Sequence, residues 1–175
     1  MEILLEILKY TIPALILFFT VYLFLKTWSK QEDKRRKHEF NMHLKDDILP
    51  VRLQAYERII LFLERVAPES ILMRIRRQGM TAAQLQAELQ NTIRHEYDHN
   101  LSQQMYVSSD AWKMVQMAKN HILKIINDSA GELKGEASGA SLGKLILERV
   151  MELQTPPSQV AINFLKKEVR ELFLN

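Results

Sequence analysis

The chain has 175 residues, a formal net charge of +3 and no cysteine. The absence of cysteine excludes disulfides, thiolate nucleophiles, iron–sulfur clusters and the common structural zinc sites. The charge is uneven, because residues 1–37 hold seven cations and four anions and the rest of the chain holds 17 of each sign. A protein that neutralises nucleic-acid phosphates gathers its excess cations on the folded domain. The neutral remainder therefore argues against a nucleic-acid partner.

An apolar run from Tyr10 to Leu25 predicts a membrane anchor. A helix over this run is apolar on every face, and cations follow it at Lys26, Lys30, Lys34, Arg35, Arg36 and Lys37. The positive side of a membrane helix stays inside, so we expect the N-terminus outside and the rest of the chain cytoplasmic, on a single-pass protein of the inner (cytoplasmic) membrane. The six cations are then candidates for contact with anionic lipid headgroups.

Two alternatives to an uncleaved anchor fit the residues less well. The uncharged run has 16 residues, whereas a bilayer asks for about 20, so a span must also include flanking residues. A buried core helix would need a soluble domain around all of its faces. A cleaved signal peptide begins with a basic region, but this chain begins with Glu2 and Glu6, and the cations come afterward.

Beyond the anchor the apolar residues recur at helical spacing, so the predicted class is all-α: an N-terminal transmembrane helix and then a single bundle of about five helices. We divide the chain into an anchor over 1–28, a charged juxtamembrane helix or linker over 29–49, and a cytoplasmic helical domain over 50–175. Pro50 is expected to interrupt the first helix, and Pro68 to end the next one. Residues 70–77 are expected to form one short turn of helix.

Thr81 and Gln84 match a capping box, which predicts a helix from there to about Gln104, with Leu85, Leu89, Ile93, Tyr97 and Leu101 on its inner face. Ser108 or Ser109 should cap the next helix, which ends near residue 128 and turns Trp112, Val115, Ala118, Ile122 and Ile125 inward. The polar, glycine-containing segment 130–141 reads as a mobile loop, with Ser141 capping the following helix. Residues 155–157 begin the last helix, whose predicted inner stripe includes Val160, Phe164 or Leu165, and Val169.

The run His95-Glu96-Tyr97-Asp98-His99 matches the H-E-x-x-H pattern, in which two imidazoles bind zinc and the glutamate activates a water molecule. At about 100° per residue, both imidazoles point away from the apolar stripe and should face water. We expect a solvated helix face here, with no catalytic residue, metal or cofactor. The segment Gly139 to Leu145 has three residues between its glycines and no preceding strand, so it lacks the geometry of a phosphate-binding loop.

Two regions carry a resemblance to a known family. They are residues 53–69, which read LQAYERIILFLERVAPE, and residues 99–108, which read HNLSQQMYVS, with Trp112. The chain resembles a family of uncharacterised, single-pass, membrane-anchored bacterial proteins built on a domain of unknown function. The resemblance implies an anchor and a helical domain, and it carries no functional residue with it.

The second of these regions is a candidate partner-binding corner. Neutral hydrogen-bonding side chains crowd a helix end there, at Asn100, Gln103, Gln104, Tyr106 and Trp112. Such groups either satisfy the bend between two helices or form a recognition surface, and the first reading is favoured because buried amides and hydroxyls commonly serve that purpose.

The leading hypothesis is a non-enzymatic, membrane-tethered helical scaffold that binds another protein or its own copy, with no small-molecule substrate. One alternative is a metal-dependent hydrolase that uses His95, Glu96 and His99. The other is a lipid or envelope-homeostasis factor that acts through the basic segment after the anchor.

Overall fold

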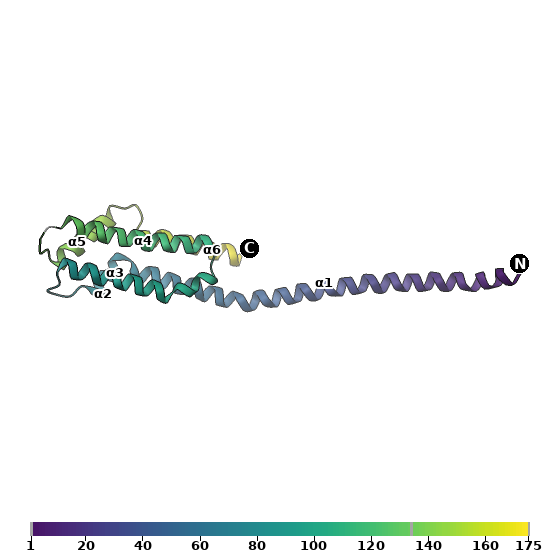
Figure 1. The fold of residues 1–175 in the computed structure, drawn as a ribbon. Helices are drawn as coiled ribbons and strands as arrows, with labels where there is room; N and C mark the ends of the chain where they lie inside the picture. The colour runs from purple at the N-terminus through teal and green to yellow at the C-terminus, as the bar shows by residue number, and fades with distance from the viewer. Residues whose placement is uncertain (1, 134, 175) are drawn as a thin grey trace. The chain divides into compact units, whose positions relative to one another are not determined.

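The computed structural model describes the backbone of residues 2–133 and 135–174, and the side chains of residues 15–28, 32, 48–133 and 135–172. Over these residues the protein is helical, as predicted, and its only β-type pairing is an isolated antiparallel bridge between Thr81 and Ser138. The chain divides into two compact units, Met1–Leu49 and Pro50–Asn175, which are described separately. Figure 1 labels the helices in chain order.

The first helix, α1, runs without a break over Glu2–Val66. The expectation that Pro50 interrupts it is therefore wrong, although the boundary between the two units falls at this residue. A proline inside a helix loses one hydrogen bond and costs roughly 3 kcal/mol. The turns after Pro50 offset this cost because they bury the large side chains Tyr56, Ile59, Phe62 and Leu63.

In the first unit, the described part of α1 exposes a run of large apolar side chains from Leu15 to Leu25, and also Trp28. A search of the described residues finds no helix that meets the length and hydropathy needed for a membrane span. The side chains of residues 1–14, which hold the start of the expected anchor, lie outside the described residues.

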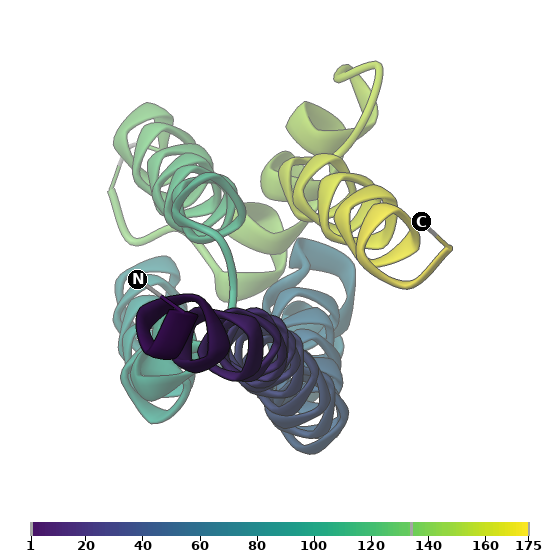
Figure 2. The same cartoon turned by 90° about the vertical axis from the view of Figure 1, so that its right-hand side faces the viewer.

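The second unit is a helical bundle (Figure 2). It contains the end of α1 and then α2 (Pro68–Ile75), α3 (Ala82–His99), the 3-10 helix η1 (Leu101–Met105), α4 (Ser109–Glu132), α5 (Gly139–Met151) and α6 (Pro157–Leu174). Helix α4 packs against α6, and α3 packs against α4 and α5, while α2 packs against α3 and α5. The expected number of about five helices is too low for the described residues, because α2 is a helix of its own. Pro68 cannot continue α1, but its fixed φ suits the first turn of a new helix.

The predicted inner face of α4 is confirmed, since all of its residues are buried, together with Ile126. That of α3 is confirmed from Leu85 to Tyr97 but is wrong at Leu101, which is 41% exposed. The reason is that α3 ends at His99, and not near Gln104, so that Leu101 belongs to η1. The stripe of α6 is wrong at its start, since Val160 is 42% exposed and the buried residues are Ala161, Ile162 and Leu165. The buried face of α6 thus begins at Ala161, one residue later than the predicted Val160. The small side chain of Ala161 suits close packing of α6 against α4.

Two helix starts near the Thr81–Ser138 bridge are tied together by backbone hydrogen bonds. The Thr81 capping box is confirmed, and Ser108 caps α4. The cap expected at Ser141 is wrong: α5 begins at Gly139, and Ser138 accepts a hydrogen bond from the Ser141 N–H at 3.2 Å. The start of α5 is set by a contact with a distant segment, because the Gly139 N–H donates to the Met80 carbonyl at 2.7 Å. A Cβ at Gly139 would lie 3.0 Å from that oxygen, so the approach favours glycine.

Candidate interaction surfaces

The predicted corner between α3 and α4 separates into a buried half and an exposed half. Asn100, Gln103 and Trp112 are buried, whereas Gln104 and Tyr106 are exposed. The Asn100 side-chain amide donates to the Glu96 carbonyl at 2.8 Å and thereby closes the end of α3.

Tyr97 is the centre of the buried half. Its ring stacks on Trp112 with the ring centroids 5.5 Å apart and meets Phe62 edge-on at 6.0 Å. The Lys119 ammonium lies 3.9 Å from the centroid of the same ring, and the Gln116 amide donates to the Tyr97 hydroxyl at 3.3 Å. These contacts join α1, α3 and α4, so Trp112 has a clear packing role.

The exposed half is a mainly apolar surface on η1 and the residue that follows it, which we call the η1 surface. It comprises Leu101 (41% exposed), the polar Gln104, Met105 (78% exposed) and Tyr106 (38% exposed). Arg52 of α1 donates to the Tyr106 carbonyl at 3.0 Å, which holds the end of η1 against the bundle. The η1 surface is thus fixed in place by its backbone while its apolar side chains face outward.

Beside this surface, a polar network links three helices. Glu168 of α6 accepts hydrogen bonds from the Tyr56 hydroxyl and, at 2.8 Å, from the Ser108 hydroxyl. Ser108 in turn accepts from the Ala111 N–H at 3.0 Å as the cap of α4. Burial, and then the hydrogen bond and charge of Glu168, raise the pKa of Tyr56 to about 12, against the opposing influence of Arg52.

Sequence reasoning missed Glu168, because its partners lie 112 and 60 residues away in the chain and no local pattern joins them. A glutamate on the partly buried side of a helix, among Leu165 and Val169, was the available signal.

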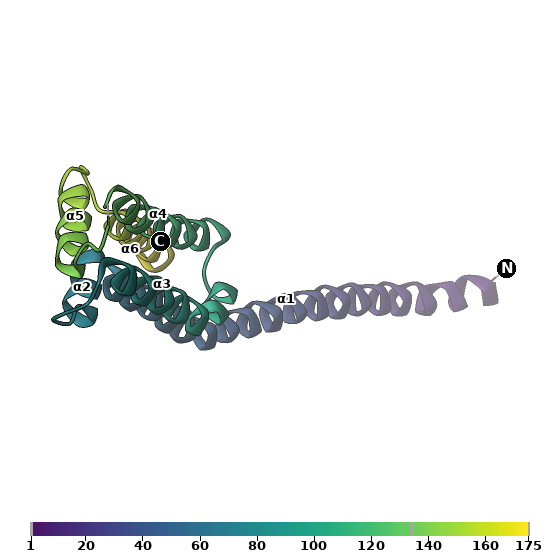
Figure 3. The same ribbon diagram turned by 60° about the vertical axis from the view of Figure 1, so that its left-hand side comes forward.

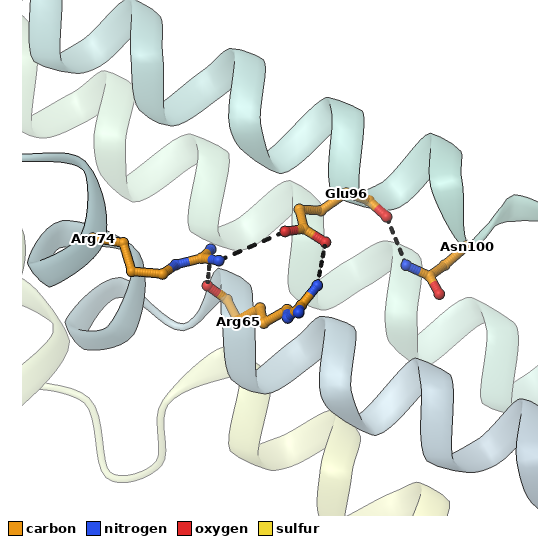
Figure 4. Close-up of polar contacts among 4 residues, drawn as sticks. All are labelled: Arg65, Arg74, Glu96 and Asn100. Atoms are coloured by element: carbon orange, nitrogen blue, oxygen red, sulfur yellow. Dashed lines mark hydrogen bonds and ion pairs between the residues drawn. The ribbon is translucent and has the colours of Figure 1, made fainter.

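The H-E-x-x-H run lies on α3 with His95 and His99 exposed, as predicted. The carboxylate of Glu96 faces two arginines, with oxygens 3.5 Å from Arg65 of α1 and 3.7 Å from Arg74 of α2 (Figure 4). Arg74 also donates to the Arg65 carbonyl at 3.0 Å. Glu96 therefore ties three helices together, and no group of three or more His, Cys, Asp or Glu side chains within the described residues is placed to hold a metal ion.

The membrane-surface candidates lie in the first unit. The Lys26 ammonium is 5.8 Å from the centroid of the Tyr22 ring. The side chains of Lys30, Lys34, Arg35, Arg36 and Lys37 lie outside the described residues. Contact of the six cations with lipid remains a prediction.

Comparison with known proteins matches a family model to residues 2–172, nearly the whole chain. The chain belongs to DUF7935, a family of unknown function. No curated protein and no solved structure matches it. The family match assigns no activity to the chain.

Proposed function

We propose that this protein is a membrane-tethered, non-enzymatic helical module that binds a protein partner, or its own copy, at the cytoplasmic face of the membrane. The observation that carries the proposal is the η1 surface, where Leu101 and Met105 of η1 and Tyr106 directly after it are exposed, and where Arg52 binds the Tyr106 carbonyl. Solvent-facing apolar side chains gathered on a rigid element are typical of a protein contact.

The tether is supported by the apolar side chains that α1 exposes from Leu15 to Leu25 and by the cations that follow them in the sequence. Such a run is costly in water, and burial in a bilayer removes that cost. The test is fractionation of cells that express the full-length chain. We expect the protein in the membrane fraction after alkaline carbonate washing, and recovery in the soluble fraction would refute the tether.

The hydrolase alternative is weakened by the contacts of Glu96. A glutamate that activates a zinc-bound water must face the metal, whereas this carboxylate faces Arg65 and Arg74. Metal analysis of the purified full-length protein gives a direct test. Stoichiometric zinc that is lost in a His95→Ala variant would restore the hydrolase hypothesis and contradict ours.

Partner binding is tested by crosslinking the full-length protein in its native cells and identifying the captured chains by mass spectrometry. The test variant is Leu101→Ser with Met105→Ser, and the matched control is Met151→Ser, because Met151 is 80% exposed and lies on α5. We expect a stoichiometric partner, or the protein's own oligomer, that is retained by the control and lost in the test variant. Recovery of the lone monomer from wild-type cells would contradict the proposal.

A further inference from the structure

Helices α2 and α5 pack side by side at the end of the bundle away from η1 (Figure 3). Side chains of these two helices line a groove. It has a volume of about 420 Å³ and is lined by Glu69, Leu72, Met73, Arg76, Gly143 and Leu147. Leu72 is buried, whereas Met73 is 87% exposed beside the groove. The lining is thus mainly apolar, with an acidic side chain early in α2 and a basic one just after it.

Gly143 lines this groove without a side chain of its own. The glycine has an ordinary helical φ, so no positive φ calls for it. A Cβ built there would lie 3.6 Å from Leu72 Cδ2 and 3.9 Å from Arg76 Cδ, which are normal contact distances. Glycine inside a helix costs roughly 0.5–1 kcal/mol relative to alanine. Helix α5 therefore carries a glycine that neither its backbone nor its packing requires, and the space it leaves belongs to the groove.

The basic end of the groove carries charge without an internal partner. Arg76 also lines an adjoining cavity of about 550 Å³, together with Arg77. Both arginines are exposed, and within the described residues neither side chain forms an ion pair, in contrast to Arg65 and Arg74. Glu136 lines the same cavity without pairing with either. Two guanidinium groups next to an apolar groove are complementary to a ligand that carries both apolar side chains and carboxylates.

We propose that the α2–α5 groove binds an acidic amphipathic helix of a partner protein. Its apolar side chains pack on Leu72, Met73 and Leu147, and its carboxylates pair with Arg76 and Arg77. A groove between two helices is the usual receptor for such a helix, and an exposed methionine adapts to the side chains it meets. A membrane surface fits less well, because the apolar floor at Leu72 is buried between the helices. This inference rests on the proposed function, and it names a second surface and the chemistry of the partner.

The experiment selects peptides of about 14 residues, or four helical turns, from a random display library on the full-length chain in mild detergent. We expect enriched peptides that place Leu, Ile, Phe or Met at helical spacing with Asp or Glu at one end. Fluorescence anisotropy on the best peptide then measures its Kd for the variants. Reversal of Arg76 and Arg77 to Glu should weaken binding tenfold or more, because it places like charges opposite the peptide carboxylates. A tenfold change in Kd corresponds to about 1.4 kcal/mol.

Two further variants and one control keep the result specific. Met73→Ala and Gly143→Ala should each weaken the peptide severalfold, the first by removing a contact and the second by filling the groove. The control Arg170→Glu, on the exposed side of α6, should leave the Kd unchanged. Circular dichroism checks that each variant is folded, so that a loss of binding cannot be caused by unfolding.

Three outcomes would overturn the groove inference: no enrichment, enriched peptides without acidic residues, or binding that survives both the arginine and the Gly143 variants. Loss of binding to anionic vesicles in the arginine variant, without peptide enrichment, would identify a lipid contact and also overturn it. The proposed function is tested separately. A partner that is crosslinked in cells equally well by the wild type and by the groove variants would leave the proposed function standing. Peptide binding in vitro without any crosslinked chain in cells would contradict the proposed function alone.

Discussion

The Glu168 network and the α2–α5 groove differ in whether their charged groups find partners inside the protein. Glu168 receives hydrogen bonds from Tyr56 and Ser108, so its charge serves the packing of α1, α4 and α6. At the groove, Arg76 and Arg77 face solvent and form no ion pair within the described residues, beside a glycine that leaves apolar space. A charge satisfied internally holds the fold together, while one left free next to apolar surface is available to a ligand. Variants in the first region should change stability, and variants in the second should change binding.

The largest effect is expected from Glu168→Ala, which removes the acceptor of two hydroxyl groups. The buried Tyr56 hydroxyl then loses the acceptor of its proton and keeps only Arg52 beside it, and we expect a loss of about 3 kcal/mol in the free energy of unfolding. Urea titration followed by circular dichroism measures it. The control is Glu171→Ala, which removes only an exposed pair with Lys167 and should cost less than about 0.5 kcal/mol. Equal effects of the two variants would show that the network is not structural.

Tyr56→Phe should cost about 1.5 kcal/mol at neutral pH, because it deletes one hydrogen bond to a carboxylate. Its pH dependence gives a sharper test. The pKa of Tyr56 is raised from 10.0 to about 12 in the folded protein, so its contribution is complete below pH 10 and is lost as the pH rises toward 12. The wild-type free energy of unfolding should therefore fall more steeply than that of Tyr56→Phe between pH 10 and 12. Parallel curves for the two proteins would contradict the raised pKa.

Gly143→Ala should stabilise the protein by about 0.5–1 kcal/mol, because alanine favours the helix and its methyl group meets Leu72 at an ordinary distance. Thermal unfolding measures the change. Gly139→Ala is the matched control, since a Cβ there would lie 3.0 Å from the Met80 carbonyl oxygen and should destabilise α5. Destabilisation by alanine at position 143 would show that packing, and not an open groove, requires the glycine.

The smallest effect on stability is expected from charge reversal at Arg76 and Arg77. Both side chains are exposed and unpaired within the described residues, so the double change to glutamate should alter the free energy of unfolding by no more than about 0.5 kcal/mol. Arg74→Glu is the comparison, because Arg74 pairs with Glu96 and binds the Arg65 carbonyl and should cost more. Urea titration of both variants compares their free energies of unfolding. A large loss from the double variant would assign Arg76 and Arg77 to the fold.

Several features of the fold followed from local patterns in the sequence. The all-α class, the inner face of α4, that of α3 as far as Tyr97, the Thr81 capping box and the exposure of His95 and His99 all rest on residues within a few turns of one another. Helical periodicity and capping act over that range, so one sequence suffices to predict them. The corner at Asn100 to Trp112 was located in the same way, but its division into a buried and an exposed half was not predicted.

Other features depended on contacts that no local pattern encodes. The continuity of α1 through Pro50, the start of α5 at Gly139 and the choice of Ala161 over Val160 in α6 were each decided by packing against a distant segment. The same holds for Glu96 between two arginines and for Glu168 beneath Tyr56, which join residues from 22 to 112 positions apart. The sequence by itself determined the all-α class, the apolar face of α4 and that of α3 as far as Tyr97, and where the cations cluster. Only the tertiary structure decided which charges are satisfied and which are free, because that depends on which helix faces meet.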